Sequence, residues 1–344
     1  MKTQYANAVT QYENGTSLGG RIIKEGGLVV FPTETVYGLG ANGLNSEAVL
    51  KIFAAKGRPA DNPLILHIAK KSELKPLWSH VPDNARILAD TFWPGPLTMI
   101  FNRSSIVPDE VTAGLDTVAV RMPLNKTARA LINAAGVPIA APSANLSGKP
   151  SPTTAEHVRQ DMDGRVDLII DGGPCKYGLE STVVSLIGRP TILRPGAVTK
   201  EMLEAMIGPV DVAHAVLSPL REGETAASPG MKYRHYAPDA EVVVAEGRER
   251  EIAAKICREY DAREAAGEDC IIFATKQTQP FYRGRNCVII GDRTKPATLC
   301  ASLFYSLREY GGRADVIFAE ALPNDDMGLA YMNRLLRSAG FNII

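Results

Sequence analysis

Residues 46–68 read SEAVLKIFAAKGRPADNPLILHI, and this stretch contains the alternation that decides the fold. Apolar residues recur at helical spacing up to Lys56, where Gly57 can end a helix. Pro63 closes a stiff loop, and residues 64–68 form a short apolar run typical of a buried strand. A helix, a loop and a strand in succession are the repeating unit of an α/β layer architecture.

The same alternation runs through the first two-thirds of the chain. We expect strands over residues 28–31, 64–68, 97–101, 118–120, 137–141, 168–170, 183–186 and 192–193, and helices over 46–56, 83–92 and 126–135. The last two strands are too close together for a helical crossover, so the twisted sheet should be mixed rather than purely parallel.

A second alternation begins after a segment without periodicity. Residues 212–238 are rich in Pro, Gly, Ala, Ser and charged residues, which predicts a linker between domains 1–211 and 239–344. The second domain is predicted as a small parallel, doubly wound, Rossmann-like sheet, with strands over 241–245, 271–274, 287–290 and 316–318 and helices over 249–266, 296–310 and 327–339.

The linker has two interpretations. Its residues 231–236, MKYRHY, combine cations with aromatic side chains, whereas disordered spacers contain few aromatic residues. The segment is either a strand edge that leads into the second domain or a lid over an anionic ligand.

Composition excludes several classes of protein. Lys and Arg together number 38, as do Asp and Glu, so no global charge draws the chain to nucleic acid or a membrane. No run approaches the ~18 apolar residues of a membrane span, and the N-terminus lacks the apolar core of a signal peptide, so we expect a cytoplasmic protein. The five Cys and five His form no CxxC or HExxH pair, and any metal ion should arrive with a substrate.

The loop that ends the first helix is a candidate site for a polyanionic ligand. Lys56 and Arg58 flank a glycine, so their side chains should leave a helix end rather than lie on a solvated face. Residues 141–145, APSAN, place Ser143 and Asn145 among small residues, where a ligand can approach the backbone closely. Together these groups suit a nucleotide.

Two familiar nucleotide and nucleophile patterns do not apply. Residues 38–43 match GxGxxG, but the preceding strand ends too early for a dinucleotide fingerprint, so we interpret them as a structural glycine loop. The chain has no Walker A motif, so any use of ATP is not of the P-loop kind. It also lacks GxSxG, which disfavours covalent catalysis through serine.

Other polar residues at strand ends are weaker candidates. Residues 32–35, PTET, could orient a small polar substrate or could simply turn the chain. Arg121 and Arg194 each end a strand, where an arginine can bind a carboxylate or phosphate bidentately. His67 lies in an apolar run and, from the residues alone, is more simply a hydrogen-bonded core histidine.

Six motifs taken together resemble one family. In order along the chain they are FPTETVYGL (31–39), KGRPADNP (56–63), PGPLT (94–98), APSAN (141–145), GLESTV (178–183) and RPG (194–196). Their order and spacing resemble the YrdC-type threonylcarbamoyl-AMP synthases. Residues 228–238, SPGMKYRHYAP, resemble the linker of that family's long form, in which a YrdC-like domain precedes a Rossmann-like domain.

The resemblance implies a nucleotidyltransferase that condenses L-threonine, bicarbonate and Mg-ATP to threonylcarbamoyl-AMP, releasing pyrophosphate and water. The product would be used by other proteins, the transferases that form threonylcarbamoyladenosine on tRNA. Contact with tRNA itself is compatible with the resemblance but not required by it. An RNA-binding module and a carbamoyl transferase of the same fold are the alternatives.

The resemblance also implies roles for individual residues. Lys56 and Arg58 would be catalytic as well as nucleotide-binding. ATP would be held by Lys56, Arg58, Asn62, Thr117, Ser143, Asn145, Ser151, Arg194 and Tyr236, with His235 as a further candidate. Threonine would be held by Thr35, His67, Arg121, Ala141 and Ser181, with Arg121 on its carboxylate. This reverses the interpretation of His67 as a core residue. No residue is identified as a general base.

Overall fold

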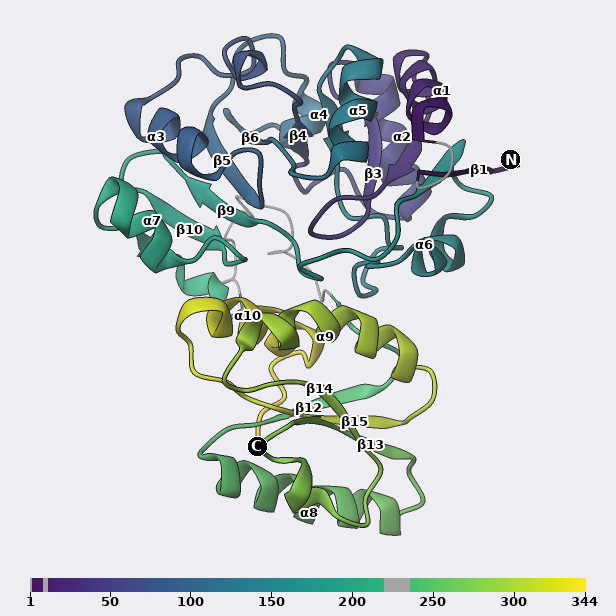
Figure 1. Ribbon diagram of the computed structural model, residues 1–344, viewed down its shortest axis with the longest axis vertical. Coiled ribbons are helices and arrows are strands. Elements are labelled where there is room, and N and C mark those ends of the chain that lie inside the picture. Colours follow the sequence, from purple (N-terminus) through teal and green to yellow (C-terminus); the bar gives the residue numbers. More distant parts are fainter. Residues whose placement is uncertain (1, 9–11, 220–235) are drawn as a thin grey trace. The chain divides into compact units, whose positions relative to one another are not determined.

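The computed structural model describes residues 2–8, 12–219 and 236–344, and the chain divides into two compact units. The first unit comprises residues 1–147 and 151–232, and the second comprises residues 148–150 and 233–344. Figure 1 shows the chain coloured along its sequence. Most of the predicted linker, residues 220–235, lies outside the described residues.

The first unit contains a large mixed sheet. Its described strands are β1 (Gln4–Asn7), β2 (Val29–Phe31), β3 (Gly38–Asn42), β4 (Ile65–His67), β5 (Leu97–Asn102), β6 (Thr117–Arg121), β7 (Ile139–Ala141), β8 (Leu168–Asp171), β9 (Thr182–Ser185), β10 (Thr191–Arg194) and β11 (Asp211–Val212). Their order in the sheet is β1-β8-β2-β3-β7-β4-β6-β5-β9-β10-β11. Because β4 runs parallel to β6 and antiparallel to β7, the predicted mixed sheet is confirmed.

Helices of the first unit pack on this sheet (Figure 1). They are α1 (Tyr12–Lys24), α2 (Ser46–Lys56), α3 (Asp83–Phe92), α4 (Asp109–Thr112), α5 (Lys126–Ala135), α6 (Ala155–Met162) and α7 (Lys200–Ile207), with 3₁₀ turns η1 (Lys71–Leu74) and η2 (His214–Val216). Helices α2, α3 and α5 have the predicted bounds. The sequence patterns missed β1, β3, β11, α1, α4, α6 and α7.

Helix α2 shows how local sequence sets an element's ends. The side chain of Asn45 accepts the N–H of Ala48 at 3.0 Å, which caps the first turn. The helix ends at Gly57, which has the left-handed φ of 62° that glycine adopts without steric cost. The loop with Arg58 therefore begins where the sequence predicted.

Two of the glycines of residues 38–43, Gly38 and Gly40, lie in a strand, which corrects the predicted loop. Gly38 and Gly40 lie in β3, between β2 and β7. A Cβ atom on Gly40 would lie 2.7 Å from Cγ2 of Ile139 and 2.8 Å from Cε1 of Phe31. Close packing of neighbouring side chains, rather than a turn, therefore explains this glycine.

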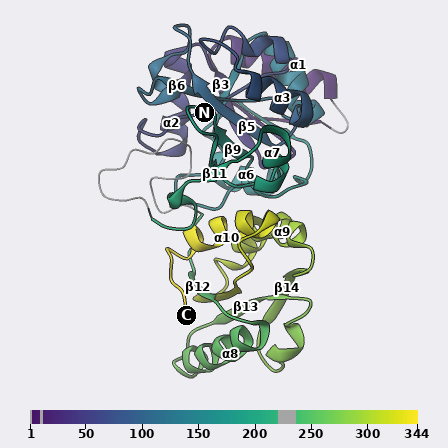
Figure 2. The same ribbon diagram turned by 90° about the vertical axis from the view of Figure 1, so that its left-hand side faces the viewer.

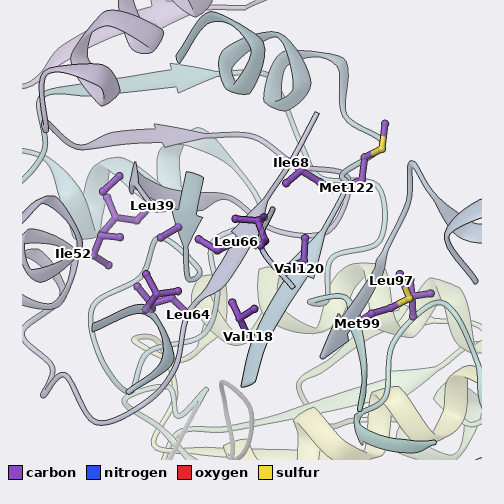
Figure 3. Close-up of a cluster of buried hydrophobic side chains, with 14 of the residues drawn as sticks. Leu39, Ile52, Leu64, Leu66, Ile68, Leu97, Met99, Val118, Val120 and Met122 are labelled. Carbon is purple, nitrogen blue, oxygen red and sulfur yellow. The ribbon is translucent and has the colours of Figure 1, made fainter. Parts of the chain in front are cut away.

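The two faces of the central strands differ. Leu64, Leu66 and Ile68 lie with Val118 and Val120 in the main hydrophobic core, shown in Figure 3. Because successive strand residues point to opposite faces, the intervening residues of β4 and β6 face away from this core. Those residues are Ile65, His67, Thr117, Ala119 and Arg121. The predicted substrate-binding residues His67, Thr117 and Arg121 thus lie on the face opposite the main core, together with the apolar Ile65 and Ala119.

The second unit is built on a parallel sheet of four described strands, which confirms the predicted small Rossmann-like sheet. The strands β12 (Glu241–Ala245), β13 (Cys270–Thr275), β14 (Cys287–Gly291) and β15 (Val316–Glu320) are ordered β12-β15-β13-β14. Helix α8 (Glu249–Ala265) covers one face, and α9 (Pro296–Tyr310) and α10 (Asp326–Ser338) cover the other, as Figures 1 and 2 show. The turn η3 (Gln279–Tyr282) follows β13.

Two further properties concern the described residues only. None of their helices combines the length and the apolar character needed to cross a membrane. No three of their His, Cys, Asp or Glu side chains come close enough together to hold a metal ion.

Candidate active site

The end of α2 and the loop after β7 meet through Lys56. This lysine is 3% exposed, and its Nζ donates to the carbonyl oxygens of Ser143 and Asn145, each at 2.5 Å. The backbone N–H of Ser147 in turn donates to the carbonyl of Lys56 at 3.0 Å. Within the loop, Oγ of Ser143 donates to Oδ1 of Asn145 at 2.5 Å. The structure therefore brings together three of the predicted nucleotide-binding residues, Lys56, Ser143 and Asn145.

Arg58 and Asn62 are paired within the loop between α2 and β4. Nη2 of Arg58 donates to the backbone carbonyl of Asn62 at 2.8 Å, and its guanidinium lies over the ring of Phe53 at 5.3 Å. Asn62 is 1% exposed, and neither Oδ1 nor Nδ2 of its amide has a hydrogen-bond partner among the described residues. Because buried amides are nearly always hydrogen-bonded, this one is suited to a ligand or an ordered water.

The register of β4 and β6 places Thr117 near the same loop. His67 is opposite Arg121 and Ile65 is opposite Ala119, with the two strands parallel. Extended by two residues toward the N-terminal ends of both strands, this register places Thr117 beside the end of the loop that contains Asn62. Thr117 and Arg121 therefore lie at opposite ends of one strand, on the same face.

Arg121 is the centre of a second, buried cluster. Its Nη1 donates to Oγ1 of Thr35 at 2.9 Å, its Nη2 to Oε1 of Glu34 at 2.5 Å, and its Nε to the carbonyl of Gly95 at 3.4 Å. Arg121 is 4% exposed and Glu34 6%. Burial tends to raise the pKa of the Glu34 carboxyl, but the charge and hydrogen bond of Arg121 lower it overall, so the pair is ionised.

Each of the two interpretations of the PTET segment applies to a part of it. Oγ1 of Thr33 donates to the carbonyl of Val36 at 2.5 Å and accepts the N–H groups of Thr35 and Val36, so Thr33 turns the chain. Thr35 and Glu34 instead contact Arg121. The segment therefore supplies two side chains to the buried cluster.

His67 is a neutral member of this cluster. Burial and the nearby charge of Arg121 lower the pKa of His67 to about 3. Nδ1 lies 3.1 Å from the carbonyl oxygen of Ile65, and the ring meets the ring of Phe31 edge to face at 6.1 Å. An uncharged imidazole at this position suits a hydroxyl or an amine rather than a carboxylate.

Ser181 and Arg194 form a third contact on the neighbouring strands. Oγ of Ser181 lies 2.8 Å from Oγ1 of Thr98 and accepts from Nη2 of Arg194 at 3.1 Å. Nε of Arg194 donates to the backbone carbonyl of Ser181 at 3.0 Å. The structure thus places a predicted nucleotide-binding arginine against a predicted threonine-binding serine, so the two predicted groups are not spatially separate.

The remaining predicted residues are also placed. Ser151 is fully buried and its Oγ donates to Oε1 of Glu180 at 2.5 Å. Ala141 ends β7 opposite Ile65 and is 3% exposed. Tyr236 lies in the second unit, where its ring is 4.9 Å from that of Phe304, and His235 lies outside the described residues. The predicted contacts of Tyr236 and His235 with a nucleotide stay predictions.

Sequence reasoning gave no individual role to three residues that contact the predicted ones, although Glu34 belongs to the PTET segment that could orient a substrate. Glu34, Thr98 and Glu180 are each buried and bonded to Arg121, Ser181 and Ser151 respectively. All three lie inside the motifs 31–39, 94–98 and 178–183, so the motifs contained the signal. Their partners are distant in sequence, and only the fold shows which side chains meet.

Comparison with known proteins supports the motif-based prediction. A family model described as "Telomere recombination" matches residues 21–196, and one described as "Threonylcarbamoyl-AMP synthase, C-terminal domain" matches residues 198–340. The chain is 47% identical to the threonylcarbamoyl-AMP synthase of Bacillus subtilis, over 94% of this chain and 92% of the relative. It is also 47% identical to that of Pyrococcus abyssi, over 94% of this chain and 93% of the relative.

A solved structure agrees with the fold of the whole chain. The crystal structure of Pyrococcus abyssi Sua5 complexed with L-threonine is 44% identical, covers 100% of this chain and 99% of its own, and superimposes with a TM-score of 0.93. With both family models matched in order along the sequence, the chain belongs to the threonylcarbamoyl-AMP synthase family, whose members are enzymes of the nucleotidyltransferase type.

Proposed function

We propose that this chain condenses L-threonine, bicarbonate and ATP into threonylcarbamoyl-AMP, with release of pyrophosphate and water. The buried cluster around Arg121, on the face of β4 and β6 opposite the main core, is the observation that carries this function. Arg121 and an uncharged His67 suit an amino acid, and the separate contacts of Lys56 and Arg58 at the end of α2 supply cationic groups suited to phosphates. The product is the activated intermediate for threonylcarbamoylation of tRNA by other proteins.

The reaction needs positioned groups rather than a protein nucleophile. The amine nitrogen of threonine forms a bond to the carbon of bicarbonate, and water leaves as the carbamate forms. A carbamate oxygen then bonds to the α-phosphorus of ATP, and the bond from that phosphorus to the oxygen bridging the β-phosphorus breaks. Negative charge builds up on the phosphate oxygens, so fixed cations and donors lower the barrier.

In this proposal each predicted site residue has the following role. Lys56, held by two carbonyls, and Arg58, held by the Asn62 carbonyl, would face the phosphates. Asn62, Thr117, Ser143, Asn145, Ser151, Arg194 and Tyr236 would complete the nucleotide site, and Thr35, His67, Arg121, Ala141 and Ser181 the threonine site. The uncharged His67 suits a hydrogen bond to threonine better than general-base catalysis, because a base that weak would rarely take a proton from an ammonium group.

We propose that Mg²⁺ enters as the complex with ATP. A bound magnesium ion neutralises phosphate charge and favours pyrophosphate as a leaving group. The phosphate oxygens and water would supply its ligands.

An assay of the full chain tests the function. Protein, Mg-ATP, bicarbonate and L-threonine are incubated together, pyrophosphate is measured, and the product is identified by the mass of threonylcarbamoyl-AMP. L-valine replaces threonine as the control, since it has the same shape but lacks the hydroxyl. Pyrophosphate release that does not depend on threonine would contradict the proposal.

A further inference from the structure

Glu34 is a buried carboxylate in the threonine site, and the function proposed above gives it no role. Its side chain is 5% exposed, and each of its oxygens accepts a hydrogen bond. Oε1 accepts from Nη2 of Arg121 at 2.5 Å, and Oε2 accepts from the backbone N–H of Asn125 at 3.1 Å. The backbone carbonyl of Glu34 accepts the N–H of Tyr177 at 2.9 Å. Three separate segments of the first unit therefore hold Glu34 in place.

The hydrogen bonds of Arg121 define what its guanidinium can still bind. A guanidinium has five N–H groups and no acceptor. Three of them are used: Nε–H on Gly95, one N–H of Nη1 on Thr35, and one N–H of Nη2 on Glu34. One N–H on each terminal nitrogen remains without an acceptor among the described residues. Two N–H groups on neighbouring nitrogens match the two oxygens of a carboxylate.

The charge of Arg121 is balanced before any substrate enters. Glu34 remains ionised because Arg121 stabilises its carboxylate in a buried setting, and the neighbouring His67 is neutral. The cluster of Arg121, Glu34 and His67 therefore has no net charge. A threonine carboxylate must then be recognised by the direction of the two remaining N–H groups rather than by excess positive charge. The groups that fix the orientation of the Arg121 guanidinium therefore determine the affinity for threonine.

We propose that Glu34 is a positioning residue, which orients Arg121 so that its two remaining N–H groups receive the carboxylate of threonine. This inference rests on the proposed function. Glu34 acts through Arg121 and does not itself touch the substrate. The bond from Oε2 to the N–H of Asn125, at the start of α5, anchors the carboxylate independently of the arginine. Glu34 therefore holds the guanidinium group of Arg121 in a fixed position relative to the start of α5.

The experiment compares the binding of L-threonine and of Mg-ATP to the full chain by calorimetry. In Glu34→Gln the arginine loses its charged acceptor, and we expect threonine to bind at least about tenfold more weakly, with Mg-ATP affinity unchanged within about twofold. Glu34→Asp keeps the charge but is one methylene too short to reach both partners. It should weaken threonine binding by a smaller factor while keeping the wild-type melting temperature.

A double-mutant cycle separates positioning from a general structural role. In the Arg121→Met background, Glu34→Gln should cause no further loss of threonine affinity, because the residue through which Glu34 acts is absent. The double variant also contains no unpaired buried charge, so it remains folded if Glu34→Gln alone does not. The control Glu204→Gln removes a carboxylate paired with Lys200 on the surface of α7, and should change neither affinity.

The possible outcomes distinguish failure of the positioning role of Glu34 from failure of the proposed function. Unchanged threonine affinity in folded Glu34→Gln and Glu34→Asp, or losses that add in the Arg121→Met background, would overturn the positioning role alone. An equal loss of threonine and Mg-ATP affinity would also overturn it, in favour of a structural role. A wild-type protein that binds no threonine would overturn the proposed function and this inference with it.

Discussion

The ammonium group of Lys56 is almost completely buried, and its two carbonyl acceptors lie 87 and 89 positions further along the chain. Burying a cation is costly unless it is hydrogen-bonded, and the two carbonyls supply acceptors to the ammonium group of Lys56. The sequence correctly predicted that this lysine leaves the end of a helix. It did not predict the acceptors, because long-range hydrogen bonds leave no local pattern.

Replacing Lys56 or Arg58 tests the phosphate-binding role at the residue scale. We expect Lys56→Ala and Arg58→Ala each to reduce pyrophosphate release by about 10²-fold or more, as loss of a transition-state donor does. Both variants should retain the wild-type circular dichroism spectrum. Lys51→Ala is the matched control on the same helix, since Nζ of Lys51 donates to the carbonyl of Gly26 rather than to the loop of Ser143 and Asn145. Full activity in Lys56→Ala and Arg58→Ala would refute their assignment.

His67 predicts a pH dependence of stability. Its pKa is lowered to about 3 in the folded state, so the unfolded chain binds a proton at higher pH than the folded one does. The stability that neutral His67 contributes is present above the unfolded pKa of about 6.5 and is lost as pH falls from there toward 3.

Urea unfolding at pH 7.5 and pH 5.0 measures this effect against His67→Gln, which cannot titrate. Between the two pH values wild type should lose about 2 kcal/mol more of its unfolding free energy than the variant does. Other carboxyl and histidine groups are common to both proteins and cancel in the difference. Parallel pH profiles would show that His67 titrates normally.

Among the elements, β3 differs most from its sequence-based interpretation. Its glycines are poor strand formers, and a GxGxxG pattern more often marks a loop. Glycine is needed at position 40 of this strand because a side chain there would collide with Phe31 and Ile139 on either side. Local propensity is thus overruled by the packing of neighbouring strands, which no single-sequence pattern records.

Adding one methyl group to β3 tests this explanation. Gly40→Ala should destabilise the protein by about 1–3 kcal/mol, because its Cβ would lie closer to two buried side chains than van der Waals contact allows. The control is Gly312→Ala, where the new Cβ meets no atom within 4 Å. Thermal unfolding of both variants measures the difference. A Gly40→Ala protein as stable as the control would mean that these neighbours move aside at no cost.

Sequence patterns predicted most elements of both units, with bounds close to those observed. Helices α2, α3, α5 and α9 and strand β12 have the expected limits, because caps and hydrophobic spacing are local signals. The elements β1, β3, β11, α1, α4, α6 and α7 were missed. β1 is short and mostly exposed, β11 has two residues, and α1 contains glycines that lower its helical propensity.

At the scale of the whole molecule, the described chain contains separate hydrophobic cores in its two units. The main core of the first unit includes Leu66 and Val120, and that of the second unit includes Ile272 and Phe318. In the second unit, polar side chains at the carboxyl ends of β13 and β15 hydrogen-bond to groups of the protein itself. Glu320 accepts from Tyr282 at 2.9 Å and from Thr275 at 3.1 Å. Rossmann-like folds that bind nucleotides use this edge for the ligand.

Separate cores predict that damage to one remains local. Ile272→Ala removes a fully buried side chain from β13, and should cost the second unit about 2–5 kcal/mol. Hydrogen exchange followed by mass spectrometry should show faster exchange in β12, β13, β14 and β15, with the strands of the first unit unchanged. Equal acceleration in both units would show that they unfold as one.

The sequence by itself determined the α/β layering, the division into two folded parts and the family, because these depend on periodicity, helix ends and motif spacing along the chain. Only the tertiary structure decided which polar groups meet. It joined Arg121 to Glu34 and Thr35, set Ser181 against Arg194, and buried His67 in its neutral form. Partnership, burial and pKa depend on residues distant in sequence, and folding is what brings those residues within hydrogen-bonding distance.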